Sequence, residues 1–114
     1  MFTFPFFYAY IYINQNKTLK GNKMTFLNIK KIKVYNINKR PNQFLIVTPD
    51  AHYFQSYESL IAMRDNEGNI YLDKNYWDYS TTTGKYRNIF LNENKKLTMN
   101  KIKNNTYSLV DLNN

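Results

Sequence analysis

The chain lacks cysteine altogether, and His52 is its only histidine. Without cysteine there is no disulfide, no thiol catalysis and no cysteine-ligated zinc, and one histidine does not make a conventional zinc site. The sequence also shows no nucleophile elbow, no metal-ligand spacing and no pair of carboxylates with a recognisable role. We therefore expect a protein that is not an enzyme and that needs no metal and no other cofactor.

His52 is the one residue whose side chain suits proton transfer, with Asp50 or Glu58 as a neighbouring carboxylate. A lone histidine in a predicted loop is, however, far more often structural or simply exposed. We therefore assign His52 no catalytic role.

An aromatic run opens the chain, with Phe or Tyr at positions 2, 4, 6, 7, 8, 10 and 12. It is too short to cross a bilayer as a helix, and it lacks the leading basic residue and the cleavage site of a signal peptide. A strand and a membrane-surface anchor remain alternatives. We favour a start of translation at Met24, because Lys20-Gly21 can be encoded by a ribosome-binding sequence. Residues 1–23 would then be a non-native leader or a flexible aromatic segment, before one domain at 24–114.

The composition favours a single small folded domain. Hydrophobic residues make up 43% and aromatic residues 18% of the 114 residues, which is enough for one core and too little chain for two domains. The 16 basic and 8 acidic residues leave a formal net charge of +8.

The basic residues gather in two stretches, whereas most acidic residues lie between them. The stretches are Lys30, Lys31, Lys33, Lys39 and Arg40, and then Lys85, Arg87, Lys95, Lys96, Lys101 and Lys103. On a shared face they would attract a polyanion such as nucleic acid. An AT-rich genome would also enrich Lys and Asn without selection for binding, so both explanations stay open.

Hydrophobic patterning and turn residues predict the order of the elements. Alternation of Ile32 and Val34 with Lys31 and Lys33 is typical of a strand. Asp65-Asn66-Glu67-Gly68 is a strong hairpin signal, because Asn and Gly tolerate positive φ. The predicted strands cover 26–37, 44–47, 60–63, 70–72 and 107–112, with turns at 40–42 and 48–50.

Two helices are predicted between the last two strands. The first begins at one of Ser80 to Thr83, which are good N-cap residues. Its apolar side holds Thr82, Tyr86, Ile89 and Phe90, so that Lys85 and Arg87 point elsewhere. The second covers 92–103 and ends at Asn104-Asn105. The fold class is therefore α+β, a small, mostly antiparallel sheet of about five strands with two short helices packed on one face.

The densest candidate binding segment precedes and opens the first of these helices. Helix N-termini and hydroxyls bind anions, lysine and arginine add charge, and aromatic rings stack on bases. The candidate binding residues are Trp77, Tyr79, Thr81, Thr82, Thr83, Lys85, Arg87, Lys30, Lys31 and Lys33. In the alternative interpretation the threonines only cap the helix, Trp77 and Tyr86 fill the core, and the cations are solvated. Gly84-Lys85 does not match a phosphate-binding loop.

Four segments in a consistent order resemble a known family. They are FQSYESLIA (54–62), DNEGNIYLD (65–73), YWDYSTTTGKYRNIFL (76–91) and YSLVDLN (107–113). The family consists of small uncharacterised proteins from phages, plasmids and other mobile elements of low-GC bacteria. The resemblance covers about 44–113 and not 1–23, and it implies no activity. Its phage context favours a host-directed inhibitor, such as an anti-CRISPR protein.

Three functions follow from these observations as hypotheses. The first is an accessory protein of a phage or mobile element that binds nucleic acid or a host nucleoprotein in the cytoplasm of the bacterial host. The second is an inhibitor of host defence that recognises a protein effector directly. The third is a structural or assembly role, for instance as a homodimer through an unpaired strand edge. In none of them do we expect stable membrane insertion.

Overall fold

A computed structural model of the protein describes residues 32–114. The elements, in chain order, are β1 (Lys33–Asn36), the 3₁₀ helix η2 (Ile37–Lys39), β2 (Gln43–Val47), β3 (Ala51–Ser56), β4 (Ser59–Asp65), β5 (Ile70–Asp73), α3 (Thr81–Leu91), α4 (Lys95–Lys103) and β6 (Ser108–Val110). The expectations for Lys30, Lys31, the aromatic run and a start at Met24 lie outside the described residues.

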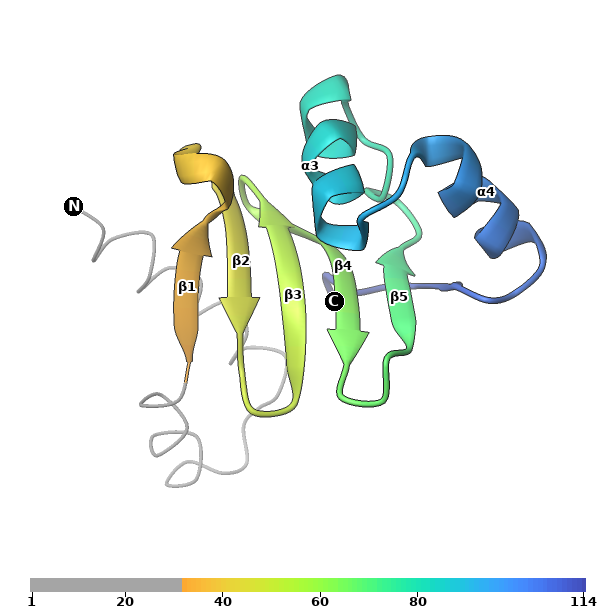
Figure 1. The fold of residues 1–114 in the computed structure, drawn as a ribbon, viewed down its shortest axis with the longest axis horizontal. Coiled ribbons are helices and arrows are strands. Elements are labelled where there is room, and N and C mark those ends of the chain that lie inside the picture. Colours follow the sequence, from red (N-terminus) through yellow and green to blue (C-terminus); the bar gives the residue numbers. More distant parts are fainter. Residues whose placement is uncertain (1–31) are drawn as a thin grey trace.

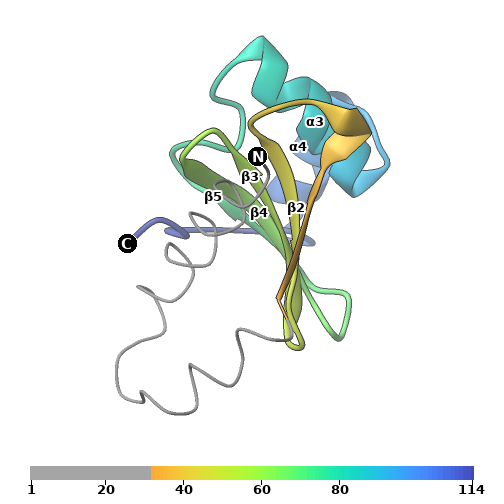
Figure 2. The ribbon, with the colours of Figure 1, turned by 90° about the vertical axis from the view of Figure 1, so that its left-hand side faces the viewer.

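The strands form one six-stranded sheet in the order β1-β2-β3-β4-β5-β6. Figure 1 shows β1 to β5 side by side in this order. Every neighbouring pair is antiparallel except β5 and β6, which are parallel. Both helices lie in the crossover connection that this parallel pair requires. Figure 2 shows the two helices on the same side of the sheet. The α+β class with a mostly antiparallel sheet is thus confirmed, with six strands where about five were expected.

The additional strand is β3, in a segment for which the sequence pattern predicts a loop. In β3 the alternation of buried and exposed residues is lost after Tyr53, because Phe54, Gln55 and Ser56 are all buried. Buried polar residues conceal the period of two on which strand prediction depends. His52 is therefore an exposed residue of a central strand and not of a loop.

Local turn and capping chemistry follows the prediction closely. The Asp65 carboxylate accepts hydrogen bonds from the backbone N–H groups of Glu67 and Asn69, and Gly68 has φ 88°. The Ser80 hydroxyl accepts from the Thr83 N–H and caps α3. These contacts span at most four residues, which is why the sequence alone indicates them.

The main core lies between α3 and one face of the sheet. Cross-strand register aligns Leu45, Phe54, Ala62 and Leu72 on that face. The α3 residues that join this core are Tyr86, Phe90 and Leu91. The predicted side of the helix is only half right, because Thr82 is exposed and Ile89 is 41% exposed. The buried positions Thr83, Tyr86, Arg87 and Phe90 follow the i, i+3, i+4, i+7 spacing of a helix face instead.

The opposite face of the sheet is apolar as well. Register aligns Val34, Ile46 and Tyr53 there, and they form a second cluster with Ile32 and Phe44. Ile46 is fully buried at 0% exposure. β2 therefore carries buried or half-buried apolar residues on both faces, whereas Lys33 and Tyr35 on one face of β1 are exposed.

Candidate functional site

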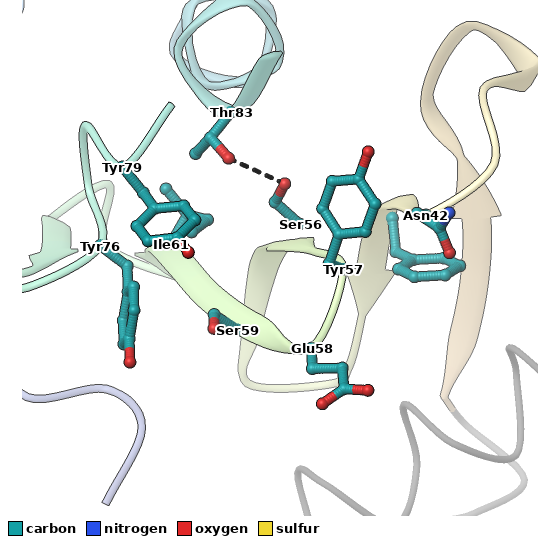
Figure 3. A pocket seen from close by; sticks show the side chains of 10 residues that line it. Asn42, Ser56, Tyr57, Glu58, Ser59, Ile61, Tyr76, Tyr79 and Thr83 are labelled. Carbon is teal, nitrogen blue, oxygen red and sulfur yellow. Dashed lines mark hydrogen bonds between the residues drawn. The ribbon is translucent and has the colours of Figure 1, made fainter. Parts of the chain in front are cut away.

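The structure distributes the predicted binding residues over two hollows, both beside α3. We call the first the hairpin pocket, because the β3–β4 hairpin forms one side of it (Figure 3). Its volume is about 590 Å³, within the usual range for ligand pockets. The residues that line it are Asn42, Phe44, Ser56, Tyr57, Glu58, Ser59, Ile61, Tyr76, Tyr79 and Thr83.

A two-residue turn, Tyr57-Glu58, places the first aromatic ring at the pocket. Ser56 pairs with Ser59 across the hairpin, so the turn is as short as a hairpin allows. Tyr57 adopts a φ of 56°, which is uncommon for a bulky side chain. The buried Gln55 side chain donates a 2.7 Å hydrogen bond to the Tyr57 carbonyl and so supports this conformation. The Tyr57 ring remains 53% exposed.

A β-bulge places Ile61 in the pocket. The register pairs Leu60 with Gln55 and Ala62 with Phe54, so that Ile61 is the extra residue of β4. A bulge bends its strand and redirects a side chain. Ile61 is buried and gives the pocket an apolar surface at its inner end.

Tyr76 and Tyr79 form the other side, and a buried carboxylate positions their loop. Asp73 accepts hydrogen bonds from the backbone N–H groups of Asn75, Tyr76 and Leu112, and so joins this loop to the C-terminal segment. The two tyrosine rings meet edge to face, 5.4 Å apart. Tyr79 is 67% exposed, which leaves its ring accessible to a ligand.

Polar groups complete the inner surface. Ser56 and Thr83 share a buried 3.0 Å hydrogen bond between their hydroxyls, which connects β3 to α3 (Figure 3). Gln43, the cross-strand partner of Ser56, is 1% exposed. Neither atom of its amide has a hydrogen-bond partner among residues 32–114. Buried amides are normally satisfied, so the region behind Ser56 retains unused hydrogen-bonding capacity.

The second hollow, which we call the α3 hollow, is broader and has a volume of about 740 Å³. Its lining residues are Asp78, Ser80, Thr81, Gly84, Lys85, Arg87, Asn88, Ile89 and Lys95.

The prediction that the Arg87 side chain is solvated and free to bind a ligand is wrong. It is only 1% exposed, and its guanidinium donates to the Trp77 carbonyl at 2.8 Å and to Asp78 at 3.0 Å. A third hydrogen bond reaches Asn88, and the guanidinium carbon lies 5.1 Å from the centre of the Trp77 ring. Arg87 therefore stabilises the loop before α3, and its charge is already balanced.

Asp78 joins the two cations at this hollow. Partial burial alone would raise its pKa, but hydrogen bonds and charges from Lys95 and Arg87 hold the pKa below its ordinary value. Two of the three cations that line the α3 hollow, Arg87 and Lys95, are thus already paired with Asp78, and Lys85 is the third.

A cationic group lies beside the hairpin pocket instead. The Arg40 Nε donates a 3.3 Å hydrogen bond to the Tyr86 hydroxyl, and the Lys85 ammonium lies 5.5 Å from the Tyr86 ring centre. Lys39 is exposed next to Arg40. Tyr86 is one helical turn from Thr83, and Arg40 is two residues from Asn42. Thr83 and Asn42 both line the pocket. We refer to Lys39, Arg40 and Lys85 as the basic cluster.

The remaining predicted residues do not join this site. Trp77 is half-buried against the core, and Thr82 and Lys33 are exposed. Thr81 lines the α3 hollow, and only Tyr79 and Thr83 line the hairpin pocket.

The contribution of the hairpin is not predicted from the sequence. Tyr57 and Ile61 are not among the predicted residues, and Glu58 is named only as a carboxylate near His52, because the strand that precedes their turn is not predicted. The sequence signal for this turn is the aromatic-polar pair Tyr57-Glu58, which stands between two short apolar segments. His52, on the exposed part of β3, lines neither hollow.

Comparison with family models gives one result. The model of a family of unknown function (DUF8033) matches residues 9–106. The chain belongs to this family. The match confirms an uncharacterised family, and it includes residues 9–23, which the resemblance described above did not cover. Comparison with curated proteins and with solved structures found no significant match.

Two further observations concern the described part of the chain. None of its helices has the length and apolar character that a bilayer-crossing helix requires. Nor does any group of three or more His, Asp or Glu residues within 32–114 have the arrangement of a metal site.

Proposed function

We propose that the protein acts by binding single-stranded nucleic acid, alone or within a host nucleoprotein, and not by catalysis. One observation carries the proposal, namely that accessible tyrosine rings line the hairpin pocket while Arg40 and Lys85 contact Tyr86, one helical turn from the pocket residue Thr83. Single strands are bound through this combination, because bases stack on aromatic rings while cations contact the phosphates.

The distribution of charge supports the proposal. Of the 16 basic residues five precede residue 32, whereas all 8 acidic residues follow it. Three of the later cations are engaged in ion pairs, namely Arg87, Lys95 and Lys101. The basic cluster has no such carboxylate partner within residues 32–114, so its charge can attract phosphate.

The proposal includes a biological context, which rests on the resemblance to proteins of phages and mobile elements. In that context the bound strand would belong to a host nucleoprotein in the bacterial cytoplasm, and a nucleic-acid-dependent defence complex of the CRISPR type is one such target. An inhibitor that contacts a host protein directly is the alternative that the experiment must separate.

The test measures binding of a fluorescent single-stranded oligonucleotide over a range of salt concentrations. Arg40→Gln with Lys85→Gln should weaken binding about tenfold or more. Each single-strand phosphate contact contributes about 0.7 to the slope of log affinity against log salt, so the slope should flatten by about 1.4. Lys96→Gln with Lys103→Gln is the matched control, because both residues are exposed on α4 and neither lines the pocket.

Equal losses in both double variants would show that only net charge matters, and would overturn this site. No binding at low salt, to DNA or to RNA, would overturn the proposed function and favour the protein-directed inhibitor.

A further inference from the structure

We infer that the hairpin pocket holds one unstacked base of the bound strand and that Glu58 selects a base with an exocyclic amino group. This inference rests on the proposed function and deepens it, because it assigns sequence preference to a named acceptor. The basic cluster by itself would bind every sequence equally.

The shape of the pocket fits a planar ligand. Figure 3 shows Tyr57 on one side and Tyr76 and Tyr79 on the other, with Ser56 and Thr83 between them. Ile61 is buried at the inner end, and Glu58 is the one charged residue among those that line the pocket. A ring that enters between the tyrosines would stack on an aromatic face and cover Ile61, as bases do in proteins that read single strands.

The charges at the pocket define an orientation. Arg40 and Lys85 of the basic cluster contact Tyr86, one helical turn from Thr83. Figure 3 shows Thr83 and Glu58 on opposite sides of Ser56. A nucleotide can therefore place its phosphate on the cations only if its base points toward Glu58. The reverse orientation would bring phosphate against a carboxylate, which is repulsive.

The chemistry of Glu58 then decides which base is preferred. An ionised carboxylate only accepts hydrogen bonds, and it pairs with the amino group of cytosine. Thymine presents carbonyl oxygens at its pairing edge, so its O4 would meet the carboxylate without a proton between them. Ser56, Ser59 and Thr83 carry hydroxyls, which donate or accept and do not distinguish the two bases.

The experiment compares oligo-dC with oligo-dT of the same length near pH 7.5. The protein should bind oligo-dC about tenfold more tightly, and Glu58→Gln should bring the ratio of the two affinities close to one. The removed charge raises the affinity for both oligomers alike, so the ratio reports the base contact. Glu67→Gln removes the same charge from the exposed β4–β5 turn and should leave the ratio unchanged.

Tyr79→Ala tests the aromatic side without risk to the core, since the ring is largely exposed. It should weaken oligo-dC binding about tenfold, whereas Tyr35→Ala on β1, which lies outside the pocket, should have little effect.

The outcomes separate the two levels of the proposal. Equal affinity for both oligomers, or a preference that survives Glu58→Gln, would overturn the base pocket and leave nucleic-acid binding standing. Failure to bind either oligomer would overturn the proposed function and this inference together.

Discussion

At the residue scale, two buried or nearly buried charged side chains organise the helical half of the protein. Arg87 joins α3 to the loop that precedes it through Trp77 and Asp78. Glu93 lies between the helices, where it accepts hydrogen bonds from Thr98, Lys101 and Tyr107. Each satisfies several donors or acceptors at once, so each is expected to stabilise the fold and not to bind a ligand.

Removal of Arg87 tests its structural role. Arg87→Ala should lower the free energy of unfolding by about 3 kcal/mol, since it breaks a largely buried pair and leaves the Trp77 carbonyl without its donor. The cost falls at the lower end of the usual range, because Asp78 is partly solvated and retains Lys95. Urea denaturation measures this change. Lys85→Ala, on the exposed side of α3, should change stability by only about 0.5 kcal/mol or less. Equal effects of the two changes would contradict the buried pair.

Glu93 should make stability depend on acidic pH. Burial would raise its pKa, but hydrogen bonds from Thr98, Lys101 and Tyr107 hold the pKa below the ordinary value of 4.5. A carboxyl whose pKa is lower in the folded state contributes its full stability above the unfolded pKa and loses it as pH falls through the folded pKa. Stability should therefore decline below about pH 4.5.

The comparison variant for this prediction is Glu93→Gln. It should be less stable than the unchanged protein at pH 7 and should show a shallower decline in acid. Urea midpoints between pH 3 and pH 7 measure both effects, and parallel curves for the two proteins would contradict the role of Glu93.

At the element scale, α3 is the element that connects the core to the candidate site. Its N-terminal turn supplies Thr83 to the hairpin pocket, and its second half packs Phe90 on the sheet. The Phe90 ring stacks on Phe54 at 6.1 Å, and Arg64 lies 4.6 Å above it while donating to the Phe90 carbonyl. The position of the pocket thus depends on how α3 packs.

Truncation of Phe90 should therefore be costly. Phe90→Ala removes a buried aromatic side chain and should lower the free energy of unfolding by about 3–5 kcal/mol. The neighbouring change Ile89→Ala, at a position that is largely solvent-facing, should cost less than about 1.5 kcal/mol. Urea denaturation of the two variants decides whether the helix register is the one described here, because a reversed order would require a rotated helix.

At the scale of the whole molecule, the sheet has an apolar cluster on each face, and α3 and α4 both lie on one side of it (Figure 2). The second face is centred on Ile46, with Val34 and Tyr53 beside it. Burial of apolar surface supplies much of the stability of a small protein. A segment that covers this face should therefore contribute to the stability of the whole fold.

The role of residues 1–23 is tested at this scale. If Met24 is the start, a chain of residues 24–114 should unfold with unchanged cooperativity and Tm, and it should be more soluble, since an exposed aromatic run promotes association. Calorimetry and solubility measurements check both expectations. A large drop in Tm would show that residues 1–23 belong to the fold, in agreement with a family match that begins at residue 9.

The sequence by itself determined the features that depend on near neighbours in the chain. The Asp65–Gly68 turn and the Ser80 cap arise from hydrogen bonds across a few residues, and their residue types are nearly specific to those geometries. The α+β class followed from the same local signals, because the order of strands and helices fixes the class without any long-range contact.

Only the tertiary structure decided which polar residues are buried and which distant residues meet. Arg87 matched the polar pattern of a helix surface, and its burial depends on Asp78 and the Trp77 carbonyl being in place. The hairpin pocket depends on contacts such as Ser56 with Thr83, 27 residues apart, and Arg40 with Tyr86, 46 residues apart. Side-chain type limits what a residue can bind, but packing between distant segments determines whether it faces solvent, core or ligand.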